Sequence, residues 1–408
     1  MKITFVTHIL TTSPGGAQRQ LCLIADGLAE RGYDVSIAVH EGARNDCPYP
    51  LDARVRIDHI CPAVSERELA RRLLIDPARS LVQRAARRIG LDGTRAVGKL
   101  LWLDRHDPFR RRLEAYLAAH RPAVAIAFMD WSVIALARSA PGYPVIRIGS
   151  NRNNPQLSYD TRTGERANPF HYAINRAALS DMDRLVTQLP DFLAWYPLHL
   201  RDRLRVISNI ILPPAATRPW TGESRSVIAV GRLVALKRFH LLVEAWHRAG
   251  PAVAGWSLEI FGYGPEASRL AARIQALGLG EAVTLHGHVE DLSEHYEKAA
   301  LLVHPAEGEG FPNGVAEALI RGRPVMGFTD CAGLNSLVLD GVNGFLVPAS
   351  DDRAGALANS LCNALAAPAK LQEMYEACTN SMRAYGAERI TDEWEQMLRE
   401  LTEPGSRM

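Results

Sequence analysis

Short apolar runs rich in valine and isoleucine alternate with longer stretches of helical periodicity along almost the whole chain. This alternation is typical of doubly wound α/β domains, in which helices join parallel strands. In the first half of the chain we expect strands at Ile3–Val6, Val35–Val39, Val55–Ile60, Val124–Phe128, Val145–Ile148, Leu185–Thr187 and Val206–Ile207. In the second half we expect strands at Val227–Val230, Leu258–Phe261, Val283–His286, Leu301–Val303, Pro324–Gly327 and Phe345–Val347. Helices are expected in the gaps, the first at Ala17–Arg31 with Gly32 ending it.

A proline-rich stretch separates the two series of strands. Three prolines fall within Ile211–Pro219, which can continue neither a helix nor a central strand. A length of 408 residues also exceeds the roughly 250–300 residues at which single cores stop growing. We therefore predict a first domain at 1–210, a linker at 211–225, a second domain at 226–385, and a final helix at 386–408 that can pack back on the first domain. Ligands of such sheets bind beyond the carboxyl ends of the strands, so the chemistry is expected in a cleft between the domains.

The composition is that of an ordinary globular protein, with 47% hydrophobic and 23% charged residues. The apolar run that follows Met1 is too short for a secretory signal, and no apolar stretch reaches the ~20 residues that span a bilayer. A cytoplasmic location is therefore expected. The six cysteines show no Cys-x-x-Cys spacing, which predicts reduced thiols rather than a zinc site or a disulfide framework.

The net charge of +2 conceals a basic segment. Between Glu66 and Arg112, twelve arginines and one lysine stand against six acidic residues, with apolar residues such as Trp102 and Phe109 among them. Two interpretations stay open, a solvated helical face or the binding site of an anionic partner. A membrane surface is the better anionic partner, because the segment shows no nucleic-acid module and the overall pI is only 8.2.

A glycine pair follows the first expected strand. Gly15 and Gly16 lie in Ser13–Arg19, at the start of the first helix. Glycines let a backbone approach a ligand closely, and a helix start offers N–H groups that suit a diphosphate. A plain strand-to-helix turn is the alternative.

Two cations follow the first strand of the second domain. Gly231 and Arg232 close that strand, and Lys237 opens the helix expected after it. Fixed cations can stabilise a leaving nucleoside diphosphate without a metal. A solvated basic helix start is disfavoured, because positive charge is unfavourable at that end of the helix dipole.

The densest cluster of candidate residues spans Glu307–Leu319 and follows the apolar run Leu301–Val303. Glu309 is expected in a loop and Glu317 about two turns into the next helix, so both carboxylates can accept hydrogen bonds from sugar or ribose hydroxyls. Anion contacts at the helix start would come from the backbone amides of Phe311, Asn313 and Gly314, in the segment that also contains Pro312.

This region resembles the large retaining glycosyltransferase family four, which is marked by a Glu-x7-Glu pair around a Gly-Phe-(Gly/Pro) loop. The pair here is Glu309 and Glu317, with Gly310-Phe311-Pro312-Asn313 inside it. The segments Phe261–Pro265, His286–Val289 and Asp340–Val347 are also similar to that family. The resemblance covers most of the second domain and, more loosely, the first. It implies the GT-B architecture, in which two Rossmann-like domains face a central cleft.

The resemblance implies a role for each matching residue. Arg232 and Lys237 would hold the donor diphosphate, Glu309 the transferred sugar, and Glu317 the ribose. The loop with Gly15 and Gly16 would close on the phosphates, and the backbone near Val289 would meet the base. Two segments depart from the family pattern, Cys331–Ser336 in place of Gly-Gly-x-x-Glu and Ser208-Asn209-Ile210 in place of Asn-Gly-Val.

The acceptor side is less defined. Gly149–Pro155 looks like the Ser-Glu-Arg-Asn-Asn-Pro segment of a bacterial branch that extends polyprenyl-diphosphate-linked oligosaccharides, with Asn151 in place of the Glu. Arg152 would then contact an acceptor phosphate or sugar. Asp130 could be an acceptor-side carboxylate or a helix cap.

No metal or other cofactor is implied. Asp181-Met182-Asp183 superficially matches the Asp-x-Asp metal site of the other glycosyltransferase fold, but it precedes a strand and lacks that fold's context. The histidines show no ligand-like spacing.

The resemblance implies a retaining enzyme that moves a hexose or N-acetylhexosamine from a UDP- or GDP-sugar to a glycan acceptor in cell-surface polysaccharide or glycan assembly, and the resemblance to the bacterial branch implies a lipid-linked acceptor. Its place of action would be the cytoplasm or the inner face of the cell membrane. Two alternatives stay open: a non-catalytic scaffold that binds nucleotide sugars, and an epimerase or phosphorylase on the same fold.

Overall fold

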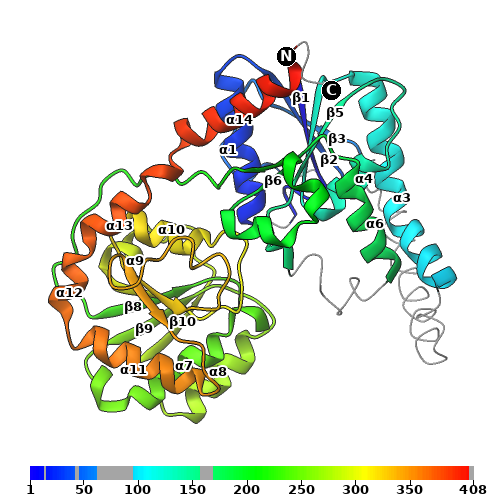
Figure 1. Ribbon diagram of the computed structural model, residues 1–408. Coiled ribbons are helices and arrows are strands. Elements are labelled where there is room, and N and C mark those ends of the chain that lie inside the picture. The colour runs from blue at the N-terminus through cyan, green and yellow to red at the C-terminus, as the bar shows by residue number, and fades with distance from the viewer. Residues whose placement is uncertain (13–14, 42–45, 62–94, 157–168, 404–408) are drawn as a thin grey trace. The chain divides into compact units, whose positions relative to one another are not determined.

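The structure, a computed structural model, describes residues 1–12, 15–41, 46–61, 95–156 and 169–403. The chain divides into two compact units (Figure 1). Unit 1 comprises Met1–Ser208 and Thr391–Met408, and unit 2 comprises Asn209–Ile390.

Unit 1 is built on a parallel sheet that has seven strands within the described residues, in the order β3-β2-β1-β4-β5-β6-β7. These are β1 Lys2–Thr7, β2 Asp34–Val39, β3 Arg56–His59, β4 Val124–Phe128, β5 Ile146–Ser150, β6 Arg184–Thr187 and β7 Leu204–Val206. The helices are α1 Gly16–Glu30, α3 Arg95–His120, α4 Asp130–Ala137 and α6 Pro169–Ser180, joined by the end of α14 Ala387–Thr402. Strand β4 is buried along its whole length, as its unbroken apolar sequence predicts.

Unit 2 repeats this architecture with six described parallel strands, in the order β10-β9-β8-β11-β12-β13. These are β8 Ser226–Val230, β9 Ser257–Phe261, β10 Val283–Gly287, β11 Ala299–His304, β12 Val325–Phe328 and β13 Gly344–Val347. The helices are α7 Phe239–Ala249, α8 Ala267–Ala276, α9 Ser293–Lys298, α10 Asn313–Ile320, α11 Arg353–Leu365, α12 Pro368–Glu373 and α13 Tyr375–Ser381. Trp246 of α7, Leu270 of α8 and Leu361 of α11 share one buried core with the sheet.

Every expected strand is present, with bounds within two residues of those predicted. In both sheets the order of strands reverses beside the first strand, because β1 lies between β2 and β4, and β8 lies between β9 and β11. Where the chain connections of two neighbouring strands run in opposite directions, a crevice forms at the carboxyl ends of those strands, and ligands of α/β sheets bind there. In unit 2 a ligand site is therefore expected at the loops after β8 and β11.

The expected linker is packed against unit 2. The Ile211 N–H donates to the Tyr385 carbonyl over 2.8 Å, and Trp220 belongs to the unit 2 core with 6% of its surface exposed. Apolar residues on either side of the prolines thus anchor this stretch, although it forms neither helix nor strand.

The final helix ends in unit 1. Trp394 is fully buried, and Glu395 accepts hydrogen bonds from Arg31 Nη1 at 2.9 Å and from Tyr33 Oη at 3.0 Å. These contacts hold the end of α14 against α1.

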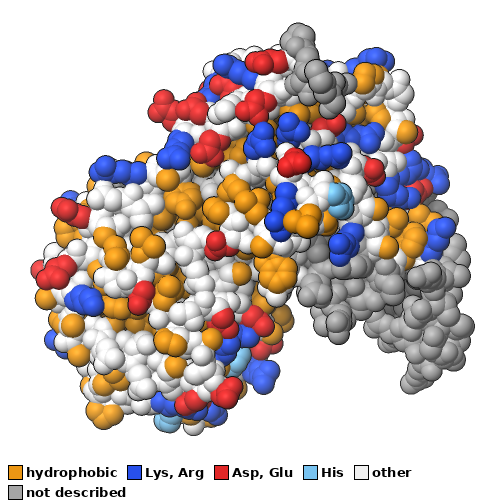
Figure 2. Space-filling model, in the orientation of Figure 1, with side chains coloured by type: hydrophobic (Ala, Val, Ile, Leu, Met, Phe, Trp, Pro, Cys, Tyr) orange, Lys and Arg blue, Asp and Glu red, His pale blue; other side chains and the backbone are white. Residues whose placement is uncertain are grey.

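The basic segment is described only from Arg95 onward, and the predicted contacts of residues 66–94 lie outside the described residues. In the described part, Trp102 and Phe109 are 4% and 2% exposed and belong to the unit 1 core. Arg110 and Arg111 both pair with Asp107, and Figure 2 shows acidic side chains among the basic ones over α3. The expectation that these apolar side chains insert into a membrane is therefore wrong for Trp102 and Phe109, because the helix buries them against its own unit.

Candidate active site

The loop after β8 is held close to the loop after β9 by glycine. The Gly231 N–H donates to the Phe261 carbonyl over 3.0 Å. A Cβ on Gly262, whose φ is +147°, would stand 1.8 Å from the Gly231 oxygen. Only glycine permits this backbone approach, which fixes where Arg232 leaves the strand.

Arg232 and Lys237 occupy different surroundings. Arg232 is exposed, and within the described residues its guanidinium makes no hydrogen bond or ion pair. Lys237 ends a 3-10 turn at Ala235–Lys237, and Arg238 follows in the left-handed region at φ 51° before α7 begins. The expectation that Lys237 opens the helix is therefore wrong, because this turn interposes one residue between Lys237 and α7.

The loops after β8 and β11 touch each other. The Glu307 N–H donates to the Leu236 carbonyl over 3.0 Å, and Arg238 pairs with the Glu307 carboxylate at 3.0 Å. These contacts bring Lys237 to Glu309, whose carboxylate Oε1 accepts a hydrogen bond from the lysine Nζ. Because β8 and β11 are neighbours in the sheet, the two predicted site residues that follow them are in contact.

A third side chain joins this pair. His304, the last residue of β11, places Nε2 2.8 Å from the same Glu309 oxygen. The three side chains are little exposed, at 16% for Lys237, 12% for Glu309 and 7% for His304. Sequence reasoning missed His304, although a polar residue that ends an otherwise apolar strand five positions before Glu309 was a usable signal.

The electrostatics keep Glu309 ionised. Burial raises the pKa of this carboxyl group, but the Lys237 ammonium and the hydrogen bond with His304 outweigh burial and lower the pKa to about 2. Glu309 is thus a hydrogen-bond acceptor at neutral pH, with no proton to donate.

A turn from the next strand supports the Glu309 backbone. The Glu309 N–H donates to the Ala332 carbonyl over 2.9 Å. A Cβ on Gly333, whose φ is +89°, would stand 2.9 Å from the Glu309 oxygen and 2.8 Å from the Gly310 oxygen. The segment Cys331–Ser336, which departs from the family pattern, therefore keeps a glycine where backbone contact with the glutamate loop requires one.

Glu317 lies on α10, the helix that this loop enters. It is the fifth residue of Asn313–Ile320, so it lies about one turn into the helix and not two, because the helix begins after Pro312. Its carboxylate accepts a hydrogen bond from Tyr296 Oη at 3.3 Å. Glu317 is half-buried.

The start of α10 is fixed by neighbours within unit 2. Phe311 is 6% exposed and its ring packs edge-on against Tyr385 at 5.5 Å. The Asn313 side-chain oxygen accepts a hydrogen bond from Asn209 Nδ2 at 2.8 Å. Asn209 belongs to the second segment that departs from the family pattern, and here it positions the first residue of α10.

The remaining donor-side predictions fall at strand ends but in different places. Val289 is half-buried and follows β10, two strands from β8 in the sheet. Gly15 precedes α1 in unit 1, where its carbonyl accepts from the Arg19 N–H at 3.1 Å and from Tyr49 Oη at 3.0 Å. Gly16 is the first residue of that helix.

The acceptor-side predictions lie inside unit 1. Asp130 is 8% exposed and is the first residue of α4, whose N-cap is Met129. Asn151 and Arg152 are 3% and 5% exposed.

The Arg152 side chain points into the unit. Its guanidinium lies 5.1 Å from the Phe128 ring centroid and 5.7 Å from that of Trp394, and it donates to the Ile207 carbonyl over 3.2 Å. Burial lowers the pKa of Arg152 to about 9. Contact with an acceptor phosphate or sugar would require this guanidinium to leave its aromatic neighbours, and the expected acceptor contact of Arg152 stays a prediction.

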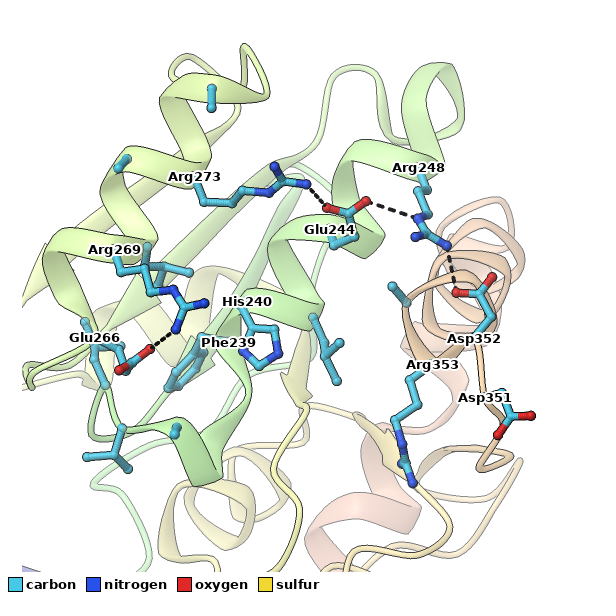
Figure 3. A pocket seen from close by; sticks show the side chains of 18 residues that line it. Phe239, His240, Glu244, Arg248, Glu266, Arg269, Arg273, Asp351, Asp352 and Arg353 are labelled. Atoms are coloured by element: carbon cyan, nitrogen blue, oxygen red, sulfur yellow. Dashed lines mark hydrogen bonds and ion pairs between the residues drawn. The ribbon is translucent and has the colours of Figure 1, made fainter.

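A groove of about 910 Å³ lies along α7 and α8 of unit 2 and extends to Leu233–Ala235 in the loop after β8 (Figure 3). Glu244 accepts hydrogen bonds from Arg273 at 2.6 Å and from Arg248 at 3.2 Å, and Arg248 also pairs with Asp352 at 2.7 Å. Four arginines and four carboxylates line the groove, so it carries no excess positive charge to attract a diphosphate.

The described residues include neither a metal-binding cluster nor a membrane-spanning helix. No three His, Cys, Asp or Glu side chains in the described ranges are grouped so that they could hold a metal ion. None of the described helices combines the length and apolar character needed to cross a bilayer.

Comparison with known proteins bears on unit 2 in particular. Residues 224–367 match the family model described as Glycosyl transferases group 1. The chain is 32% identical over 201 residues to an exopolysaccharide phosphotransferase of Streptomyces coelicolor, with 49% of this chain and 21% of that protein covered. It is 31% identical over 210 residues to the UDP-N-acetylglucosamine–peptide N-acetylglucosaminyltransferase GtfA subunit of Streptococcus gordonii, with 50% of this chain and 41% of that protein covered. The chain thus spans less than half the length of either relative.

The whole chain is similar to a solved structure. Sucrose-phosphate synthase from Thermosynechococcus elongatus matches with a TM-score of 0.76 at 19% identity, and the match covers 98% of both chains. The protein therefore has the GT-B fold, with two Rossmann-like units on parallel sheets. The match of residues 224–367 to the glycosyl transferases group 1 model includes Glu309 and Glu317, in agreement with the resemblance of that region to a glycosyltransferase family.

Proposed function

We propose that this protein transfers a hexose or N-acetylhexosamine from a UDP- or GDP-sugar to a glycan acceptor, with retention of anomeric configuration. The observation that carries the proposal is the Lys237–Glu309 pair with His304 at the carboxyl ends of β8 and β11, inside the residues that the family model matches. The names of the relatives support a role in exopolysaccharide or other glycan synthesis and a UDP-sugar as donor.

The donor roles follow from the chemistry of each group. Arg232 and Lys237 would stabilise negative charge on the departing diphosphate without a metal ion. The N-terminus of α10, at Phe311–Asn313, adds a favourable dipole for the same anion. Glu309, fixed as a carboxylate, would accept hydrogen bonds from hydroxyls of the transferred sugar.

The nucleoside would be held farther along the site. Glu317 would accept hydrogen bonds from the ribose hydroxyls, and the Val289 backbone would meet the base. In unit 1, Gly15 and Gly16 would approach the phosphates, and Asp130, Asn151 and Arg152 would form the acceptor side.

The acceptor that we propose is lipid-linked and is met at the inner face of the cell membrane. Its support is the similarity of Gly149–Pro155 to a branch acting on polyprenyl-linked glycans and the seven excess positive charges between Glu66 and Arg112.

The test begins with a panel of UDP- and GDP-sugars, of which the true donor should raise the melting temperature. The donor is then incubated with lipid-linked and free glycan acceptors, with and without a metal chelator, and the anomeric configuration of the product is determined by NMR. Donor binding without turnover on any acceptor would favour a scaffold, and an altered free sugar nucleotide would favour an epimerase. A product of inverted configuration, or loss of activity with the chelator, would overturn those parts of the proposal.

A further inference from the structure

The Glu309 carboxylate uses one oxygen for two donors. Both Lys237 Nζ and His304 Nε2 contact Oε1, and within the described part of the chain Oε2 accepts no hydrogen bond. The protein thus saturates one oxygen and leaves the other for a ligand.

The two donors differ in how readily a ligand can draw them away from Glu309. A carboxylate only accepts, so His304 Nε2 must donate, and it does so both as the neutral Nε2–H tautomer and as imidazolium. Lys237 has a flexible stem, and a bound diphosphate competes for its ammonium. His304 is the last residue of a buried strand, and its side chain is only 7% exposed.

If Lys237 turned from Glu309 to a diphosphate, the buried Glu309 carboxylate would lose its ion-pair partner. Such a charge is costly unless another donor stays with it. His304 is that donor, since its bond to Oε1 does not depend on where Lys237 points.

We propose that His304 is a positioning residue, which holds Glu309 oriented and ionised while Lys237 serves the donor diphosphate. This inference rests on the proposed function. It adds a third residue to the Lys237–Glu309 pair and explains why a polar side chain ends an apolar strand. The competing interpretation is a core histidine that merely satisfies its own ring nitrogen at a strand end.

The two interpretations predict different effects when His304 is replaced by glutamine or by asparagine. The amide nitrogen of glutamine can take the place of His304 Nε2, whereas asparagine is too short to reach Glu309. His304→Gln and His304→Asn therefore bury similar polar groups but differ in the one contact at issue. His247→Asn, at an exposed position of α7, controls for the loss of a histidine elsewhere in unit 2.

The experiment measures kcat and KM with the identified sugar nucleotide, the Kd for free UDP or GDP, and the melting temperature. We expect His304→Asn to lower kcat about 10- to 100-fold, the range for a hydrogen bond to a charged group, with under about threefold change in nucleotide Kd. His304→Gln should stay within about threefold of wild type. In a Glu309→Gln background, His304→Asn should change kcat by less than about threefold, because the residue it positions is gone.

The inference is overturned if His304→Asn has wild-type kcat, if glutamine fails to restore it, or if the loss is undiminished in the Glu309→Gln background. A wild-type protein that transfers no sugar from any donor overturns the proposed function and this inference together. Normal wild-type turnover with an unaffected His304→Asn overturns the inference alone.

Discussion

Neutralising Lys237 should destabilise unit 2 by leaving Glu309 with one partner fewer. The pKa of Glu309 is lowered from its usual 4.5 to about 2, and one pKa unit is worth about 1.4 kcal/mol. The favourable environment of the carboxylate is thus worth about 3 kcal/mol, shared by Lys237 and His304. The charge of Lys237 is the largest contribution that lowers this pKa. We therefore expect Lys237→Met to reduce the free energy of unfolding by about 2 kcal/mol at pH 7.

A double-mutant cycle isolates this pair. Lys237→Met, Glu309→Gln and the double variant are unfolded in urea at pH 7 and followed by circular dichroism. We expect the double variant to be about 2 kcal/mol more stable than the sum of the single losses predicts, because neither buried charge is then left without the other. Additive losses within about 0.5 kcal/mol would show that Lys237 does not hold Glu309, and would refute the electrostatic reasoning.

The pH dependence of the same cycle has a defined sign. The folded-state pKa of Glu309 lies below its usual value, so its stabilising contribution is fully present above about pH 5 and is lost as the pH falls toward 2. The coupling between Lys237 and Glu309 should shrink over that window. A coupling of unchanged size at the acid end would contradict the assignment of the lowered pKa to this pair.

Three further predictions concern other parts of the chain. Glu317→Ala should weaken binding of the free nucleoside diphosphate by about 1–3 kcal/mol in calorimetry, whereas Glu309→Gln should spare it, and equal effects would end this division of roles. Gly262→Ala should lower the melting temperature far more than Gly278→Ala, since both have positive φ but only Gly262 would press a Cβ against the Gly231 oxygen; similar shifts would mean that the backbone contact is unimportant. Wild type should co-sediment with anionic vesicles at low salt more than a variant with Arg84, Arg87, Arg88, Arg110, Arg111 and Arg112 changed to Gln, and equal binding would leave this segment as a solvated surface.

The fold could be predicted because its signal is local. A run such as Val124–Phe128 is apolar at every position, which a parallel strand covered on both faces requires and an exposed loop does not. The meeting of Lys237 and Glu309 could also be expected, because each follows a strand whose carboxyl end lies at the same edge of one sheet.

Other features of the site depend on contacts for which the sequence has no local signal. The left-handed Arg238, which separates Lys237 from α7, is not a glycine and carries no local signal. The guanidinium of Arg152 packs near Trp394, more than 200 positions along the chain, and a local motif cannot reveal such a partner. Burial of Trp102 and Phe109 escaped notice for a related reason, since an amphipathic basic segment has the same pattern whether its apolar side faces a lipid or a core.

The division of the chain also has a consequence for synthesis. Unit 1 is discontinuous, because its last segment, from Thr391, follows the whole of unit 2 in the sequence. A ribosome that has finished Ser208 must add about 180 further residues, which takes roughly 10–40 s, before Trp394 can enter the unit 1 core. Until then the first sheet emerges without the helix that covers part of it, whereas unit 2 is contiguous and can complete its core at once. The nascent first unit should therefore be the part that depends on chaperones, and truncation of the segment that begins at Thr391 should affect it and not unit 2.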